Sequence, residues 1–107
     1  MNIQTNDIVK CNYALHDLYN VYDPEIGLNI VDLGLVYELH FDEVDHKLLC
    51  MMTLTTQFCP MGDAITRDTY NSLVKSYPGW EVTVSLTFDP AWDLSMLSDD
   101  GKAFLGR

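Results

Sequence analysis

The sequence predicts a two-layer α+β sandwich, in which two helices cover one face of a small mixed β-sheet. Three observations favour this fold. Apolar residues recur at helical spacing in residues 7–22, a hairpin pattern spans residues 35–56, and strict alternation of apolar and polar residues marks residues 80–88. The expected order is helix, β-hairpin, helix, strand. A chain of 107 residues has room for one domain, which we expect to span residues 1–107.

The first helix is predicted over residues 7–22. Thr5 or Asn6 could cap its first turn, and Asp23 before Pro24 should end it, because the residue before a proline avoids the helical region. Its apolar stripe consists of Ile8, Cys11, Leu15, Leu18 and Tyr22.

Residues 25–34 fit neither the helical nor the strand period, so we expect an ordered loop with a short turn of helix or a short edge strand. The hairpin strands are predicted at residues 35–42 and 47–56, joined by the polar residues 43–46, and a third strand at residues 80–88. Because the opposite faces of these strands are polar, we expect helices on one side of the sheet only. The alternation leaves open whether the third strand joins beside the first or the second. The inward residues are Leu35, Tyr37, Leu39 and Phe41, then Leu48, Cys50, Met52 and Leu54, then Trp80, Val82, Val84, Leu86 and Phe88.

A second helix is predicted from Pro60 to about Tyr77, where Pro78-Gly79 should end it. Residues 94–104 should add one or two helical turns to an otherwise irregular tail. The apolar residues of the second helix are Met61, Ile65, Leu73, Val74 and Tyr77.

The charge of the chain excludes one class of function. Sixteen acidic residues face six basic ones, which gives a net charge of −10 and a surface that repels the phosphates of nucleic acids. The same charge would suit a basic partner. It would equally be explained if acidity did no more than keep a small protein in solution.

We expect neither a membrane span nor a secretory signal, since there is no apolar run of about 20 residues and no basic segment before an apolar one. Three widely spaced cysteines make no disulfide framework, so we expect a cytoplasmic protein.

Cys59 is the residue whose position most favours chemistry. It follows the end of the second hairpin strand and precedes Pro60, which fits the first turn of a helix. The thiol would then lie at or next to the N-cap, where unpaired amides and the helix dipole stabilise the thiolate, the form that binds metals and attacks electrophiles. The alternative is a buried cysteine with no chemical role, and spacing alone does not decide between the two.

The other two cysteines fit the core. Cys11 lies on the helical stripe and Cys50 on an inward strand face, and no two cysteines have CxxC spacing. A single thiolate cannot hold a metal ion tightly, so any metal would need a second chain, a partner or carboxylates. Carboxylates are present in the loops, although loop acids are usually solvated, and no Ser/His/Asp set is visible. The loop acids are Asp23, Glu25, Asp32, Asp89 and Asp93.

Four segments together resemble a known family, the SufT/PaaD-like metal–sulfur cluster assembly family. They occur in the order typical of that family and extend over nearly the whole chain. The segments are Asp23-Pro24-Glu25-Ile26-Gly27, Ile30-Val31-Asp32-Leu33-Gly34-Leu35-Val36-Tyr37, Met52-Thr53-Leu54-Thr55-Thr56 leading into Cys59-Pro60, and Phe88-Asp89-Pro90-Ala91-Trp92-Asp93. Gln57-Phe58 departs from the small or proline-containing pair that is typical before the cysteine, which could alter access to Cys59.

The resemblance implies a non-enzymatic accessory role in iron–sulfur cluster assembly or in the maturation of iron–sulfur proteins. It implies that Cys59 is the reactive thiol and the contact for a transiently bound iron–sulfur cluster or iron. Asp23, Glu25, Thr55 and Thr56 match the polar positions around it. The implied partners are iron–sulfur client or assembly proteins.

Two other functions stay open. Cys59 could be the nucleophile of a thiol-dependent acyl or sulfur transferase, although no general base is visible. The chain could also be an interaction module whose cysteine has no chemical role. If Cys59 contacts an iron–sulfur cluster, we expect a homodimer, because symmetric pairing would bring two thiolates together.

Overall fold

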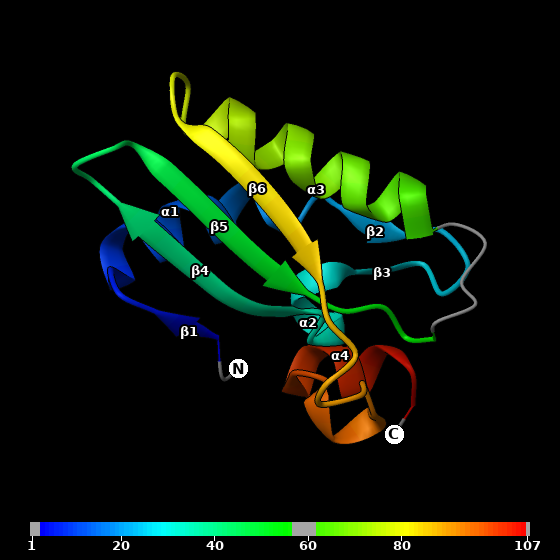
Figure 1. Ribbon diagram of the computed structural model, residues 1–107. Helices are drawn as coiled ribbons and strands as arrows, with labels where there is room; N and C mark the ends of the chain where they lie inside the picture. The colour runs from blue at the N-terminus through cyan, green and yellow to red at the C-terminus, as the bar shows by residue number, and fades with distance from the viewer. Residues whose placement is uncertain (1–2, 57–61, 107) are drawn as a thin grey trace.

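The computed structural model describes residues 3–56 and 62–106. Its strands and helices are interspersed along the chain, which ends in a short helical tail (Figure 1). They are β1 (Gln4–Thr5), α1 (Ile8–Leu18), β2 (Tyr22–Asp23), β3 (Leu28–Asn29), α2 (Ile30–Leu33), β4 (Val36–Asp42), β5 (Lys47–Met52), α3 (Gly62–Ser76), β6 (Glu81–Leu86), the 3-10 turn η1 (Leu94–Met96) and α4 (Asp99–Phe104).

The main sheet has the strand order β1-β4-β5-β6, and β2 and β3 form a separate small hairpin. β4 and β5 are antiparallel, whereas β1 is parallel to β4 and β6 is parallel to β5. The third predicted strand therefore lies beside the second hairpin strand. Helices α1 and α3 pack behind this sheet, and its front face carries no helix among the described residues (Figure 1). The predicted two-layer fold with a mixed sheet is confirmed.

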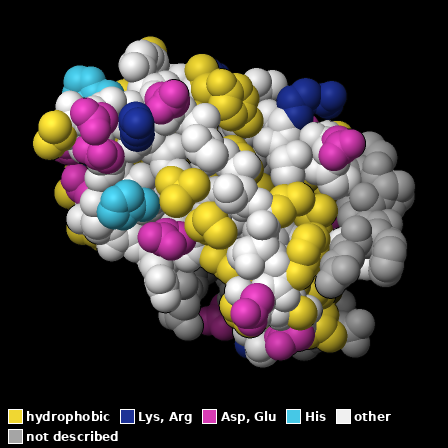
Figure 2. Space-filling view, viewed as in Figure 1, with side chains coloured by type: hydrophobic (Ala, Val, Ile, Leu, Met, Phe, Trp, Pro, Cys, Tyr) yellow, Lys and Arg dark blue, Asp and Glu magenta, His cyan; other side chains and the backbone are white. Residues whose placement is uncertain are grey.

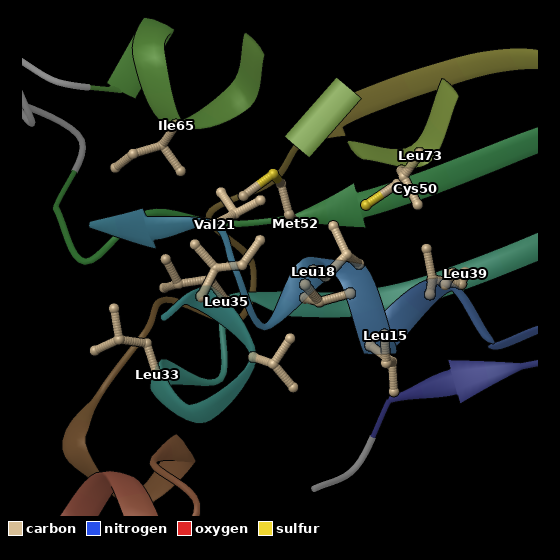
Figure 3. Packing of buried hydrophobic residues seen from close by; sticks show 14 of the residues in the cluster. Leu15, Leu18, Val21, Leu33, Leu35, Leu39, Cys50, Met52, Ile65 and Leu73 are labelled. Carbon is tan, nitrogen blue, oxygen red and sulfur yellow. The ribbon is translucent and has the colours of Figure 1, made fainter. Parts of the chain in front are cut away.

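The core lies between the two helices and the sheet. Figure 3 shows Leu18 of α1, Leu39 of β4, Met52 of β5 and Leu73 of α3 pointing into this space, and each of them is fully buried. Burial of one such side chain stabilises the fold by about 1.5–3 kcal/mol. The predicted inward residues Leu15, Phe41, Leu48, Leu54 and Val82 are also buried.

The first helix is shorter than predicted. Asp7 is its N-cap, because the Asp7 carboxylate accepts the amide hydrogen of Lys10 at 3.1 Å, so neither Thr5 nor Asn6 has this role. Asn6 instead forms two hydrogen bonds with the backbone of Phe41, at 2.7 and 2.8 Å, and fastens the N-terminal segment to β4. The helix ends at Leu18. Ile8 and Tyr22, which the stripe included, are 64% and 51% exposed.

A β-bulge in β4 corrects the predicted inward face of that strand. The register shifts between Val36 and Glu38, so Val36 lies opposite Met52 and takes the inward position that alternation gave to Tyr37. The hydroxyl of Tyr37 instead donates to the carbonyl of Pro90 at 2.9 Å, in the C-terminal tail.

Two further predicted core positions are exposed. Leu86, the last residue of β6, is 44% exposed and Val74 of α3 is 37% exposed. Thr69 fills the helix–sheet interface instead, and its hydroxyl donates to the carbonyl of Ile65 at 2.8 Å. The short elements expected in residues 25–34 and 94–104 are present as β3 with α2, and as η1 with α4.

Across the described ranges, no helix has the length and apolar character that a membrane crossing requires.

Candidate functional site at the junction of β5 and α3

Cys59, Pro60 and the pair Gln57-Phe58 lie outside the described residues, so the predicted position of the thiol at a helix start stays a prediction. The residues on either side of this segment are placed closely together. Leu54 is buried, and a Cβ atom added to Gly62, the first residue of α3, would lie 2.7 Å from Leu54 Cδ1. Leu54, which precedes this segment in the sequence, and Gly62, which follows it, therefore lie close together.

Thr55 and Thr56 lie at the outer end of the segment that follows β5. The amide of Thr53 donates to the carbonyl of Leu35 at 2.8 Å, which extends the sheet contact by one residue beyond the strand. Thr53 and Leu54 are buried, Thr55 is half-buried and Thr56 is exposed. The two threonines thus lie where the chain passes from the core to the surface.

Asp23 has a structural role in the β2–β3 hairpin. Its side chain is buried, and its carboxylate accepts the amide hydrogens of Glu25 at 2.9 Å and Ile26 at 3.3 Å. Its carbonyl accepts the amide hydrogen of Gly27 at 2.7 Å, and Gly27 has a positive φ of 81° that suits glycine. Asp23 therefore fixes the turn on which Glu25 is exposed to solvent.

A chain of backbone hydrogen bonds connects the Asp23 hairpin to the threonine segment. Ile30 donates to Val21 at 2.9 Å, Leu35 donates to Ile30 at 3.0 Å, and Thr53 donates to Leu35. Figure 3 shows Val21, Leu35 and Met52 close together in the same part of the core. The structure thus fastens both segments to the short stretch around α2. Convergence of the four polar residues on Cys59 itself stays a prediction.

The two cysteines that the structure describes are both core residues, as predicted. Cys11 is 2% exposed and Cys50 is fully buried. Burial raises the pKa of the Cys50 thiol to about 12, and burial raises the pKa of Cys11 although a hydrogen bond from Thr5 opposes it. Both groups are therefore protonated thiols near neutral pH.

Asp32 and Asp93 serve the C-terminal tail. The Asp32 carboxylate accepts from the Asn29 side chain and from the Ser98 hydroxyl, each at 2.7 Å. Asp93 caps the turn η1, and hydrogen bonds from Ser95 lower the pKa of its carboxyl. Within the described ranges, no group of three or more His, Cys, Asp or Glu side chains is arranged to hold a metal ion.

The tail also forms a groove that the sequence did not reveal. A hollow of about 580 Å³ lies between the β1–β4 edge of the sheet and the tail, and its walls include Tyr37, Met51 and Met96. These residues come from three segments, and their common location depends on the bulge at Tyr37 and on Gly34. Gly34 has a φ of 80°, and a Cβ atom there would lie 2.2 Å from the carbonyl oxygen of Met96. Gly34 belongs to the segment of residues 30–37 that resembles the family, and this glycine was the one feature of the sequence that could have indicated the close approach of the tail.

Comparison with known proteins decides the family. Residues 15–86 match the family described as "Iron-sulfur cluster assembly protein", which is more than half of the chain. The chain belongs to this family. The predicted resemblance is confirmed, and the matched range extends from α1 to the end of β6.

Curated relatives and solved structures agree with this membership. The chain is 40% identical to the "Fe-S protein maturation auxiliary factor" of Porphyromonas gingivalis, over 83% of this chain and 84% of the relative. It is 38% identical to the "Fe-S protein maturation auxiliary factor SufT" of Staphylococcus aureus, over 80% and 97%. A DUF59 domain from Bacillus anthracis matches with a TM-score of 0.85 and 34% identity, over 92% and 93% of the two chains. A conserved hypothetical protein from Thermotoga maritima matches with a TM-score of 0.75 and 33% identity, over 100% and 99%.

Proposed function

We propose that this protein is an accessory factor for iron–sulfur cluster assembly or for the maturation of iron–sulfur proteins, and that it acts through Cys59. The observation that carries the proposal is family membership, with curated relatives at 38–40% identity that are named as iron–sulfur protein maturation auxiliary factors. Because those relatives are named as auxiliary factors, the role proposed is that of a carrier or adaptor, not of an enzyme.

Cys59 is the thiol that suits this role, since burial keeps Cys11 and Cys50 protonated and away from solvent. A thiolate at Cys59 would contact iron or a cluster that is passing to another protein. One protein thiolate per chain binds such cargo weakly, which favours release, whereas a closed site with four protein ligands retains its metal.

The supporting polar residues have separate roles in this proposal. The hydroxyls of Thr55 and Thr56 would donate hydrogen bonds to the Cys59 sulfur and lower its pKa. A carboxylate in contact with that sulfur would raise its pKa, so the exposed Glu25 is assigned to the partner or the cargo. Asp23 contributes by holding the turn that presents Glu25.

The proposed setting is the cytoplasm, with iron–sulfur client or assembly proteins as partners. A homodimer would place two Cys59 thiolates at one cluster. The net charge of −10 on each chain opposes that association at low ionic strength. Light scattering over a dilution series at 20 mM and 300 mM salt tests the dimer, which should be more populated at the higher salt. A monomer throughout assigns the remaining ligands to a heterologous partner.

The function is tested by deleting the gene and measuring aconitase, an iron–sulfur dehydratase, together with its protein level under iron limitation. We expect lower aconitase activity at unchanged protein level, rescue by the wild-type chain, and no rescue by Cys59→Ala. Cys11→Ala is the matched control, because it removes a thiol that the structure places in the core, and it should rescue wherever the variant folds. Normal aconitase in the deletion strain contradicts the function, whereas rescue by Cys59→Ala contradicts only the role of that thiol.

A further inference from the structure

The groove beside the C-terminal tail has neither Thr55, Thr56 nor Gly62 in its described lining. Its floor is on the uncovered face of the sheet, where Glu38 of β4 and Met51 of β5 are paired neighbours. Tyr37 and Met96 form one wall, and the Tyr37 hydroxyl lies 3.3 Å from the Met96 sulfur. Figure 2 shows the molecule hollowed between the N-terminal edge of the sheet and the C-terminal segment.

The groove is continuous with two apolar side chains on the otherwise polar front face of the sheet. Met51 and Leu49 are half-buried, and the register places both on the face of β5 opposite Cys50. The neighbours of Leu49 on this face are polar, His40 of β4 and Thr83 of β6. A site for a small molecule usually encloses most of its ligand. An open groove that continues along β5 onto Leu49 fits a length of polypeptide better.

The charge of the groove limits which polypeptide it can accept. Its described lining includes the carboxylates of Glu38 and Asp89, and it includes no Lys, Arg or His. Neither carboxylate forms a salt bridge with another described residue. A cationic segment would supply the missing opposite charge, whereas a second copy of a chain with net charge −10 or a nucleic acid would be repelled.

We propose that this groove is a docking site for a peptide segment of another protein, with a large apolar side chain next to Lys or Arg. The apolar side chain packs between Tyr37, Met51 and Met96, and the cation lies near Glu38 or Asp89. That the partner is an iron–sulfur client or assembly protein rests on the proposed function, whereas the peptide chemistry rests on the groove alone.

The experiment uses the full chain and a displayed library of random heptapeptides, from which binders are selected and synthesised. Each binder is titrated into protein labelled with ¹³C at the methionine methyl groups. Met51 and Met96 line the groove, whereas Met52 is fully buried on the opposite face of β5 and serves as the internal reference. We expect peptides enriched in Lys or Arg beside Leu, Ile, Met or Phe, and shifts at Met51 and Met96 that exceed any shift at Met52.

The charge contribution is measured with Glu38→Gln/Asp89→Asn, which should weaken binding by about 10-fold. The matched control is Asp45→Asn/Asp68→Asn, which changes the net charge equally at exposed residues outside the groove and should change affinity less than about twofold. The proposal is overturned if no selected peptide binds, if the binders lack basic residues, or if Met51 and Met96 do not shift. Groove binding combined with normal aconitase in the deletion strain would reject the proposed function and leave the docking site standing.

Discussion

The two ends of the sheet are held together in different ways. At the β4–β5 turn, aromatic rings form the contacts: Tyr77 lies 5.3 Å from Phe41 and 5.5 Å from Trp80, measured between ring centroids. At the opposite end, hydrogen bonds form the contacts. Trp92 Nε1 donates to the Leu33 carbonyl at 2.6 Å, and Ser98 donates to Asp32 through both its amide and its hydroxyl.

We infer from this difference that one end of the sheet contributes mainly to stability and the other mainly to function. The hollow nearest the packed rings has a volume of about 270 Å³, whereas the groove among the hydrogen-bonded segments has a volume of about 580 Å³. Thr55, the Glu25 turn and the tail groove all lie at the hydrogen-bonded end. We therefore expect substitutions at the aromatic end to lower stability, and substitutions at the other end to change binding and reactivity first.

Thiol reactivity should show the largest contrast. In native protein at pH 8, we expect iodoacetamide to modify Cys59 at least about a thousand times faster than Cys50, because a thiol with a pKa of about 12 has very little thiolate at that pH. Mass spectrometry of peptides from timed samples measures both rates. The contrast should disappear in 6 M guanidinium chloride, where burial no longer acts on Cys50. Modification of Cys11 or Cys50 before Cys59 would contradict the proposed site.

Phe41→Ala should have the largest effect on stability. Phe41 is 3% exposed and contacts the rings of Tyr77 and Trp80, and such a truncation costs about 3–5 kcal/mol in the free energy of unfolding. Urea unfolding followed by fluorescence measures the cost. Tyr13→Ala is the control, since Tyr13 contacts the same cluster but is 60% exposed, and it should cost much less. Equal costs would mean that the rings do not act as a packed unit.

Asp32→Ala should have a smaller effect on stability and a distinct local one. The substitution removes the acceptor of the Asn29 side-chain amide and of the Ser98 hydroxyl, which costs about 1–3 kcal/mol. Hydrogen exchange should show faster exchange in α4 than in β5, because Ser98 is the N-cap of α4. The exposed Asp45→Ala is the matched control. Uniform loss of protection across both elements would contradict a local role for Asp32 in fastening the tail.

Lys10→Met should have the smallest effect. Lys10 forms salt bridges with Glu43 and Asp7, and the hydrogen bond with Glu43, followed by that with Asp7, raises the pKa of its ammonium group. These groups are solvated, so the melting temperature should fall only slightly at low ionic strength. In 1 M salt the wild-type chain and the variant should melt together. A difference that persists in 1 M salt would show that the methylene groups of Lys10 contribute by packing.

The fold was predictable where a pattern repeats. Alternation in residues 80–88 and the stripe through Cys11, Leu15 and Leu18 placed the main strand and helix, because burial of one face imposes a fixed period. Predictions from the pattern were wrong where a single local contact determines the structure. Nothing in the alternation indicates that β4 contains a bulge at Tyr37, or that Asp7 instead of Thr5 or Asn6 caps α1.

For the candidate site, the resemblance pointed to Asp23 and Glu25, and their membership of the site stays a prediction. The sequence did not indicate that Asp23 is buried and Glu25 exposed, since the turn that places them depends on hydrogen bonds from backbone amides. The groove was not predictable, because Tyr37, Met51 and Met96 meet only through tertiary contacts.

The attachment of the tail has a consequence for fragments of this protein. The match to the family ends at residue 86, yet Leu97 of the tail is 5% exposed and belongs to the hydrophobic core. A fragment cut at residue 86 would leave the Leu33 carbonyl without the Trp92 indole and Asp32 without Ser98. It would also lack the wall of the groove that Met96 provides. Recombinant fragments and fusion proteins that are designed from the matched range alone should therefore aggregate more readily, and a purification tag should follow the tail instead of replacing it.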